Sequence, residues 1–102
     1  GQDLLDLAAA LHPTPALGGH PRPDAVPHIR TLEGFPRGLF GGVVGWFDHA
    51  GNGEFAVAIR SARVNADRAT VYAGAGIVEG SDPGTEKRET DLKFEALLRA
   101  LL

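Results

Sequence analysis

Two acidic side chains and a lysine recur at helical spacing near the end of the chain, at Glu86, Glu89 and Lys93. At about 100° per residue, these side chains would fall within roughly 60° of one another on an α-helix. Two carboxylates beside an ammonium group could hold a divalent cation next to an anionic ligand. Mixed charges on a helix flank are more often simply solvated, and this pattern is less specific than a paired Cys or His motif. On spacing alone, the solvated flank is therefore favoured over the metal site.

The segment after Ser81 predicts the helix that would carry these charges. Asp82 can act as its N-cap, and Pro83 then occupies the first helical position. Proline is tolerated there because the N–H that it lacks would have no partner within the helix. Further along, four apolar residues at i, i+3, i+4, i+7 spacing form a stripe for burial against a sheet or another helix. The members of the stripe are Phe94, Leu97, Leu98 and Leu101.

The middle of the chain carries the two-residue apolar period of β-strands. This period predicts three antiparallel strands near 39–48, 54–64 and 69–78. The turns between them are rich in Gly, Asn and Asp, which is typical of hairpin connections. The strands should therefore follow one another as a meander.

An arginine and two glycines could form a binding face on this meander. Arg60 would project from the middle strand across a surface of small side chains, where it could reach a ligand or pair at the sheet surface. Gly74 and Gly76 would share one face of the third strand, and glycine weakens a strand unless another group must come close. Two interpretations explain these glycines equally well. A ligand carboxylate could bind the exposed backbone N–H groups, or a helix could pack tightly against the strand. Both alternatives stay open from the residues alone.

The first third of the chain predicts two helices and a stiff loop. An apolar helical face predicts a helix over residues 3–11, which must end before Pro13 because proline disfavours helical geometry in the preceding residue. Residues 12–23 carry four prolines and two glycines, which indicates a shaped loop. A second helix is predicted over about 24–33, with Pro27 tolerated in its first turn.

Composition limits the classes of protein to which the chain can belong. Its 102 residues make one domain at most, and 43% hydrophobic with 23% charged residues is typical of a globular chain. A net charge of −3 without a basic cluster argues against binding to nucleic acid or to an anionic membrane surface. Without cysteine there is no disulfide or thiolate chemistry, and we expect a reducing compartment, the cytoplasm. No apolar stretch is long enough to span a bilayer.

Other chemistries find little support in the sequence. The serines lack the context of a hydrolase nucleophile, and the four histidines lack the spacing of a zinc site. These histidines are His12, His20, His28 and His49. The chain starts at Gly1 and contains no methionine, so we expect it to be a processed piece or an excerpt of a longer protein.

Five motifs follow one another along nearly the whole chain. They are LHPTPALGG at 11–19, LFGGVVGW at 39–46, AIR at 58–60, AGAGIV at 73–78 and ExxETxxK at 86–93. In this order and combination they resemble the chorismate-utilising enzymes, specifically the isochorismate synthases. The combination is far more specific than any single motif, and it reverses the preference for a merely solvated helix flank.

The resemblance implies an α+β fold, an antiparallel β meander with flanking helices, of which residues 1–102 would be the C-terminal part. It also implies that the intact enzyme converts chorismate to isochorismate with Mg²⁺, by general acid–base catalysis. A lysine would activate the attacking water, and a glutamic acid would protonate the departing hydroxyl group. Both groups, and a first metal carboxylate, would lie upstream of Gly1. We therefore expect the chain by itself to be inactive.

Position by position, the resemblance assigns metal binding to Glu86 and Glu89, with Glu89 as the preferred direct ligand. The same resemblance assigns substrate contacts to four positions. These positions are Ala16 beside the ring, Arg60 and the backbone at Gly74 on the enolpyruvyl carboxylate, and Lys93 beside the ring carboxylate.

Two alternatives remain beside an isochorismate synthase. One is another chorismate-utilising synthase that makes salicylate, anthranilate or aminodeoxychorismate, although Gly19-His20-Pro21-Arg22 departs from the Gly-x-Pro-Lys common in the last two. The other is a non-catalytic module that uses Arg60 and Gly74 to bind a small carboxylate, or its exposed sheet to pair with a partner protein. Expected partners are chorismate and the missing N-terminal part of the enzyme, and exposed sheet edges favour self-association of the chain. The motifs leave open whether the product serves menaquinone or siderophore synthesis.

Overall fold

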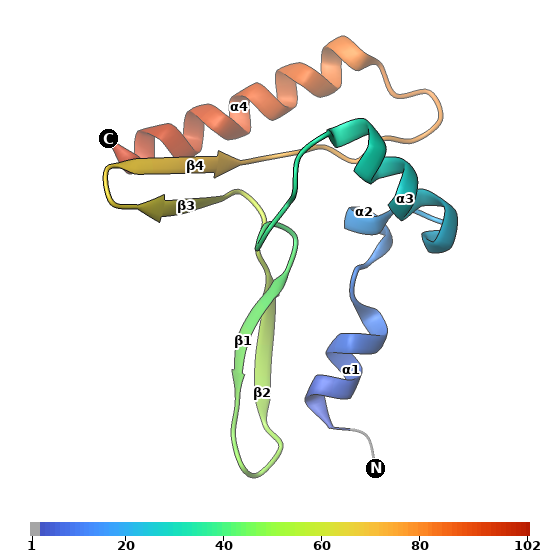
Figure 1. Ribbon diagram of the computed structural model, residues 1–102, viewed down its shortest axis with the longest axis vertical. Coiled ribbons are helices and arrows are strands. Elements are labelled where there is room, and N and C mark those ends of the chain that lie inside the picture. Colours follow the sequence, from blue (N-terminus) through green and yellow to red (C-terminus); the bar gives the residue numbers. More distant parts are fainter. Residues whose placement is uncertain (1–2) are drawn as a thin grey trace. The chain divides into compact units, whose positions relative to one another are not determined.

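The computed structural model describes residues 3–102, which divide into two compact units, one up to Ala58 and the other from Ile59 to Leu102. The first unit contains α1 (Leu4–Leu11), α2 (Pro15–Gly18), α3 (Arg22–Glu33), β1 (Val43–Phe47) and β2 (Gly53–Val57). The second unit contains β3 (Ser61–Asn65), β4 (Arg68–Tyr72) and α4 (Pro83–Leu101) (Figure 1). Helices combined with antiparallel strand pairs confirm the predicted α+β class.

Local hydrogen bonds set both ends of α1. The Asp6 N–H donates to Asp3 Oδ1 over 2.9 Å, and the Asp3 N–H donates to Asp6 Oδ2 over 3.1 Å, which together form a capping box. At the other end His12 is the C-cap, with an extended backbone, and its N–H donates to Ala8 O over 3.0 Å. The prediction that the helix ends before Pro13 is confirmed.

The segment between α1 and β1 is more helical than the sequence predicted. Its expected loop over 12–23 contains the short helix α2, and α3 begins at Arg22, earlier than predicted. Because Pro23 already occupies the first turn of α3, Pro27 lies in the interior of the helix. The prediction that Pro27 sits in the first turn is therefore wrong. The helix ends at Gly34, whose φ of 68° suits a glycine C-cap.

The β1–β2 hairpin is closed by a turn that its own side chains hold. Asp48 accepts hydrogen bonds from the Asn52 side-chain amide at 3.2 Å and from the Asn52 N–H at 2.9 Å, and these bonds lower the pKa of Asp48. In the middle of β1, Gly45 faces the backbone of β2 so closely that a β-carbon would collide with the Glu54 carbonyl oxygen. This strand glycine therefore permits close pairing of two backbones.

The predicted middle strand over 54–64 is not continuous. The β1–β2 ladder ends at Val57, the β3–β4 ladder begins at Ser61, and each ladder forms a separate two-stranded sheet. Between them Arg60 has a φ of 45°, a left-handed conformation that interrupts the extended backbone. The prediction that Arg60 projects from a continuous middle strand is therefore wrong.

The predicted third strand over 69–78 is shorter than expected, since β4 ends at Tyr72. A strand exists only where a neighbour accepts and donates its hydrogen bonds, and residues 73–78 have no such ladder within the described part of the chain. The prediction that Gly74 and Gly76 share a strand face is thus not met.

The last helix begins where the sequence predicted it. Asp82 is the N-cap, and Asp82 Oδ2 accepts from the Thr85 N–H at 2.8 Å and from Thr85 Oγ1 at 2.9 Å. In Figure 1 α4 runs alongside β4 within the second unit. Of the predicted apolar stripe, Phe94 and Leu97 are half-buried, whereas the more C-terminal leucines are exposed.

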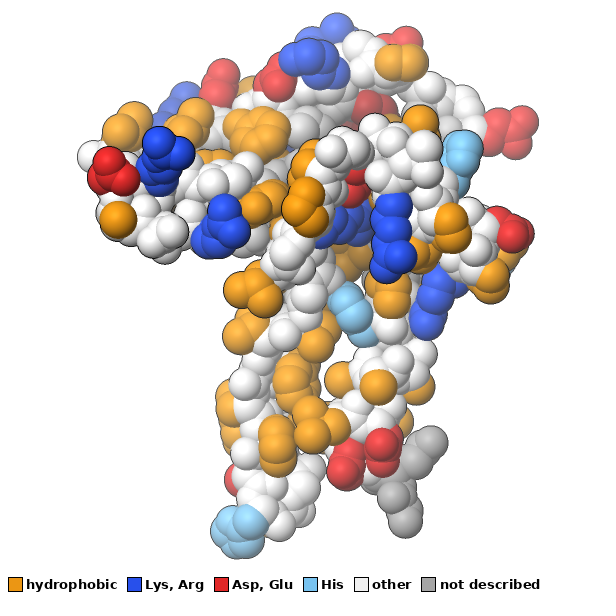
Figure 2. Space-filling model, viewed as in Figure 1, with side chains coloured by type: hydrophobic (Ala, Val, Ile, Leu, Met, Phe, Trp, Pro, Cys, Tyr) orange, Lys and Arg blue, Asp and Glu red, His pale blue; other side chains and the backbone are white. Residues whose placement is uncertain are grey.

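Large apolar side chains are left uncovered in both units. No hydrophobic side chain among residues 3–102 is fully buried, and Leu39 and Trp46 expose 85% and 57% of their surface. Figure 2 shows hydrophobic side chains gathered along the β1–β2 hairpin. Exposed apolar surface of this extent is typical of interaction sites for protein, membrane or ligand. None of the helices in the described range is long and apolar enough to cross a membrane.

The N-cap of α4 gives a testable expectation for stability. Asp82→Ala removes the acceptor for the Thr85 N–H, so we expect a lower thermal midpoint of unfolding, whereas Asp82→Asn keeps an acceptor oxygen and should lose less. The bonds from Thr85 hold the pKa of Asp82 below its ordinary value of 3.8. A carboxylate with a lowered folded-state pKa stabilises the fold above the unfolded-state pKa, and that contribution is lost as the pH falls through the folded-state pKa.

The destabilisation by Asp82→Ala should therefore be full at neutral pH and should shrink below the ordinary pKa of 3.8. Thermal melts followed by circular dichroism, at neutral pH and at about pH 2, measure it. Asp91→Ala is the matched control, because Asp91 lies on the same helix in an exposed ion pair with Lys87. Equal losses for Asp82→Ala and Asp91→Ala would contradict the capping role.

Candidate functional site

A direct contact joins two of the predicted substrate-binding positions in the second unit. Lys93 Nζ, on α4, donates to the Gly74 carbonyl oxygen over 2.7 Å. Gly74 belongs to the segment that leaves β4 after Tyr72, so the lysine ties this segment to the helix. Lys93 itself is half-buried. The structure thus brings together Lys93 and the backbone at Gly74.

Arg60 lies at the end of the β3–β4 hairpin from which the Gly74 segment leaves. Ser61 of β3 pairs with Tyr72 of β4 at the end of the ladder. Arg60 precedes Ser61 and Ala73 follows Tyr72, so both lie directly beyond this last pair. The Arg60 side chain is exposed, and its guanidinium makes no hydrogen bond or ion pair within residues 3–102. It can therefore receive an anion at the open end of the hairpin.

The two predicted metal ligands lie on the first turns of α4. Glu86 is half-buried and Glu89 is exposed, and neither carboxylate is engaged by a hydrogen bond or an ion pair in the described part of the chain. No cluster of three or more His, Cys, Asp or Glu side chains suited to a metal occurs among residues 3–102. Mg²⁺ is commonly held by one or two carboxylates together with water and substrate oxygens. These two residues fit part of such a site.

Ala16 belongs to the first unit, whereas the other predicted positions belong to the second. It follows Pro15 in the first turn of α2, and its side chain is exposed. Pro13, the proline that ends α1, packs close to Gly18 at the end of α2. The motif around Ala16 therefore forms a short helical turn rather than an extended loop.

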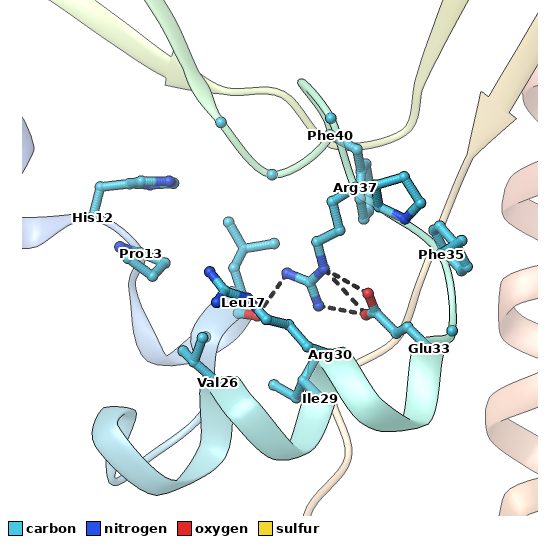
Figure 3. A pocket seen from close by; sticks show the side chains of 16 residues that line it. His12, Pro13, Leu17, Val26, Ile29, Arg30, Glu33, Phe35, Arg37 and Phe40 are labelled. Atoms are coloured by element: carbon cyan, nitrogen blue, oxygen red, sulfur yellow. Dashed lines mark hydrogen bonds and ion pairs between the residues drawn. The ribbon is translucent and has the colours of Figure 1, made fainter.

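A hollow of about 800 Å³ in the first unit was not predicted from the sequence. Figure 3 shows its labelled side chains, which come from the end of α1, from α2 and α3, and from the segment before β1. Apolar groups line most of it, and a histidine, two arginines and a glutamate contribute the charges. Those ionisable residues are His12, Arg30, Arg37 and Glu33.

Within this hollow Arg37 forms a two-pronged ion pair with Glu33. Arg37 Nε donates to Glu33 Oε2 over 2.9 Å and Nη2 donates to Oε1 over 2.6 Å, while Nη1 donates to Leu17 O over 2.9 Å. The guanidinium carbon lies 5.9 Å from the centre of the Phe40 ring. The side-chain hydrogen bonds to Glu33 raise the pKa of Arg37. The i, i+4 spacing of Glu33 and Arg37 is the sequence signal that could have identified this pair.

His12 adds a polar atom that the described residues leave unsatisfied. Its Nδ1 is buried and has no hydrogen-bond partner within residues 3–102. Buried polar atoms normally have a partner, because desolvation without one is unfavourable. His12 Nδ1 is therefore an open polar position in the lining of the hollow.

Comparison with known proteins gives a consistent result. A family model for chorismate binding enzymes matches residues 1–102. The chain is 49% identical over 98 residues to the salicylate biosynthesis isochorismate synthase of Pseudomonas aeruginosa, covering 96% of this chain and 21% of that protein. It is 52% identical over 97 residues to isochorismate synthase DhbC of Bacillus subtilis, covering 95% of this chain and 24% of that protein.

A solved structure agrees with these sequence relatives. The crystal structure of DhbC from Bacillus anthracis matches 99% of this chain with a TM-score of 0.93 at 46% identity, and the match covers 27% of that structure. The chain therefore spans only about a quarter of the length of the proteins it matches. These matches confirm the resemblance that the motifs indicated. With a family model matching every residue and relatives near 50% identity, the chain belongs to the chorismate binding enzyme family.

Proposed function

We propose that this chain is the C-terminal, substrate-binding part of an isochorismate synthase, which in the intact protein converts chorismate to isochorismate. Relatives at 49% and 52% identity are named isochorismate synthases, which supports the reaction class. The observation that carries the proposal is the 2.7 Å hydrogen bond from Lys93 Nζ to Gly74 O, which joins two positions that the family motifs assign to substrate.

The charges of the second unit suit a dicarboxylate such as chorismate. Arg60 presents an exposed guanidinium fork, which can engage a carboxylate through two parallel N–H donors. Lys93 keeps donors beyond the one that it gives to Gly74. In this proposal Arg60 and the Gly74 N–H bind the enolpyruvyl carboxylate, and Lys93 lies beside the ring carboxylate.

Glu86 and Glu89 are the groups of this chain that would hold Mg²⁺. Their carboxylate oxygens have no hydrogen-bond or ion-pair partner within residues 3–102, and hard oxygen ligands are the ones that Mg²⁺ prefers. We take Glu89 as the direct ligand. When bound, Mg²⁺ would offset the negative charge of the ring carboxylate and hold the ring in place.

The reaction itself moves a hydroxyl group, since water attacks C2 of the ring while the C4 hydroxyl departs. The residues of this chain bind and orient the ring in that step. Its two lysines are unsuited to be the base, because Lys87 pairs with Asp91 at 2.9 Å and Lys93 binds Gly74 O. The groups that remove and deliver protons are therefore proposed to lie in the rest of the enzyme.

The uncovered apolar surface supports the same division. Side chains such as Trp46 and Leu39 expose more than half of their surface, and His12 Nδ1 is buried without a partner in the described residues. We propose that the remaining part of the catalytic domain packs on these faces. Burial of such area is the main favourable term in the association of two protein segments.

The first test is the activity of the chain by itself. We expect no isochorismate from the chain with chorismate and Mg²⁺, because the proton-transfer groups are proposed to lie elsewhere, and steady turnover from the intact enzyme. Product chromatography measures both. A separately produced remainder of the catalytic domain should restore part of the activity when mixed with the chain. Turnover by the chain alone would refute the division, and anthranilate or salicylate as the product of the intact enzyme would reassign the reaction.

The second test concerns the metal ligand. In the intact enzyme Glu89→Gln should lower kcat/KM at a fixed Mg²⁺ concentration by about 10- to 100-fold and raise the Mg²⁺ concentration for half-maximal rate, since it removes a carboxylate charge. Glu95→Gln is the matched control, because Glu95 lies on the same helix, is exposed and pairs only loosely with Arg99 at 3.7 Å. If Glu89→Gln left the Mg²⁺ titration as it is in the wild type, Glu89 would not be a ligand.

A further inference from the structure

The guanidinium of Arg37 is committed to two partners in the hollow of the first unit. Nε and Nη2 donate to the two carboxylate oxygens of Glu33, and Nη1 donates to the Leu17 carbonyl oxygen over 2.9 Å (Figure 3). All three nitrogens are thus in use. These bonds show that Arg37 holds two protein groups, the Glu33 carboxylate and the Leu17 carbonyl, in a fixed arrangement.

The element that Arg37 holds has few other means of fixing its orientation. α2 has four residues, and its N-cap Thr14 makes no side-chain capping hydrogen bond. A single helical turn is unstable unless tertiary contacts fix it. Gly19 follows with a φ of 70°, and a β-carbon there would come within 2.6 Å of Ala25 on α3. The bond to Leu17 O is the side-chain hydrogen bond that anchors this turn within the described residues.

We propose that Arg37 is a positioning residue that holds the Leu17 peptide and thereby orients Ala16, the position that would face the substrate ring. This inference rests on the proposed function, since the role of Ala16 comes from the family motif. Glu33 fixes the plane of the guanidinium through its two oxygens, which leaves Nη1 directed at Leu17 O. Arg37 acts through Ala16 and makes no contact with the substrate.

The chemistry of the contact also predicts which substitutions preserve it. A lysine carries the charge but not the planar fork, so it can bind Glu33 or Leu17 O but not both in one fixed geometry. Glu33→Gln keeps one acceptor oxygen and loses the charge that strengthens the bond. Arg37→Lys and Glu33→Gln should therefore lie between the wild type and Arg37→Ala.

The test uses the intact enzyme with chorismate and Mg²⁺, assayed well below its unfolding temperature. We expect Arg37→Ala to lower kcat/KM by about 10- to 100-fold, as for a misplacement of about 1 Å at a substrate contact. Arg37→Lys and Glu33→Gln should recover part of that loss. Arg99→Ala is the matched control, since it removes an arginine from an exposed i, i+4 pair with Glu95 that has no carbonyl partner in the described chain. It should leave kcat/KM unchanged.

Two further readouts separate positioning from mere stabilisation. In a double-mutant cycle with Ala16→Val, the two changes should be non-additive in kcat/KM, because Arg37 acts through Ala16. Hydrogen exchange at the α2 amides should quicken in Arg37→Ala and not in Arg99→Ala. Additive effects, or a loss that only tracks the unfolded fraction, would overturn the inference. A wild-type enzyme that forms no isochorismate would refute the proposed function instead, and the exchange measurement would still decide whether Arg37 holds α2.

Discussion

The hydrogen bond from Lys93 Nζ to the Gly74 carbonyl oxygen is the contact on which the candidate site of the second unit depends. Residues 73–78 lie outside the β3–β4 ladder, so strand pairing within the described residues does not fix them. The lysine ties this segment to α4, the helix that carries Glu86 and Glu89. A charged donor makes a stronger hydrogen bond than a neutral one, which allows one side chain to join the two elements.

Sparse burial of apolar groups explains why such polar contacts matter throughout the chain. The capping box of α1, the Asp48 turn and the N-cap of α4 each close within four residues. Bonds of this kind fix an element but contribute little to its packing against others. Packing requires apolar area removed from water, and residues such as Trp46 remain exposed. The matches cover 21% and 24% of two family relatives, and in the proposed function the remainder of the enzyme packs on these exposed side chains.

The sequence predicted the features that local chemistry determines. Pro13 ends α1 because proline acts on the residue directly before it. The break in the strand predicted over 54–64 was missed, because Arg60 adopts a left-handed backbone that its residue type does not indicate. The hollow was missed because it joins segments that no local period links, although Glu33 and Arg37 have the spacing of an ion pair. The candidate site was predicted from the order of family motifs, since spacing alone favoured a solvated helix flank.

Arg37, Lys93 and Arg60 differ in how far other groups of the described chain compensate their charges. Arg37 has its charge compensated by a carboxylate and its nitrogens occupied. Lys93 donates to a neutral carbonyl, so its charge is not compensated, and Arg60 has no ion-pair partner within residues 3–102. The same range leaves Glu86 and Glu89 without a cationic partner. In the proposed function, a dicarboxylate bound together with a divalent metal would compensate charges of both signs.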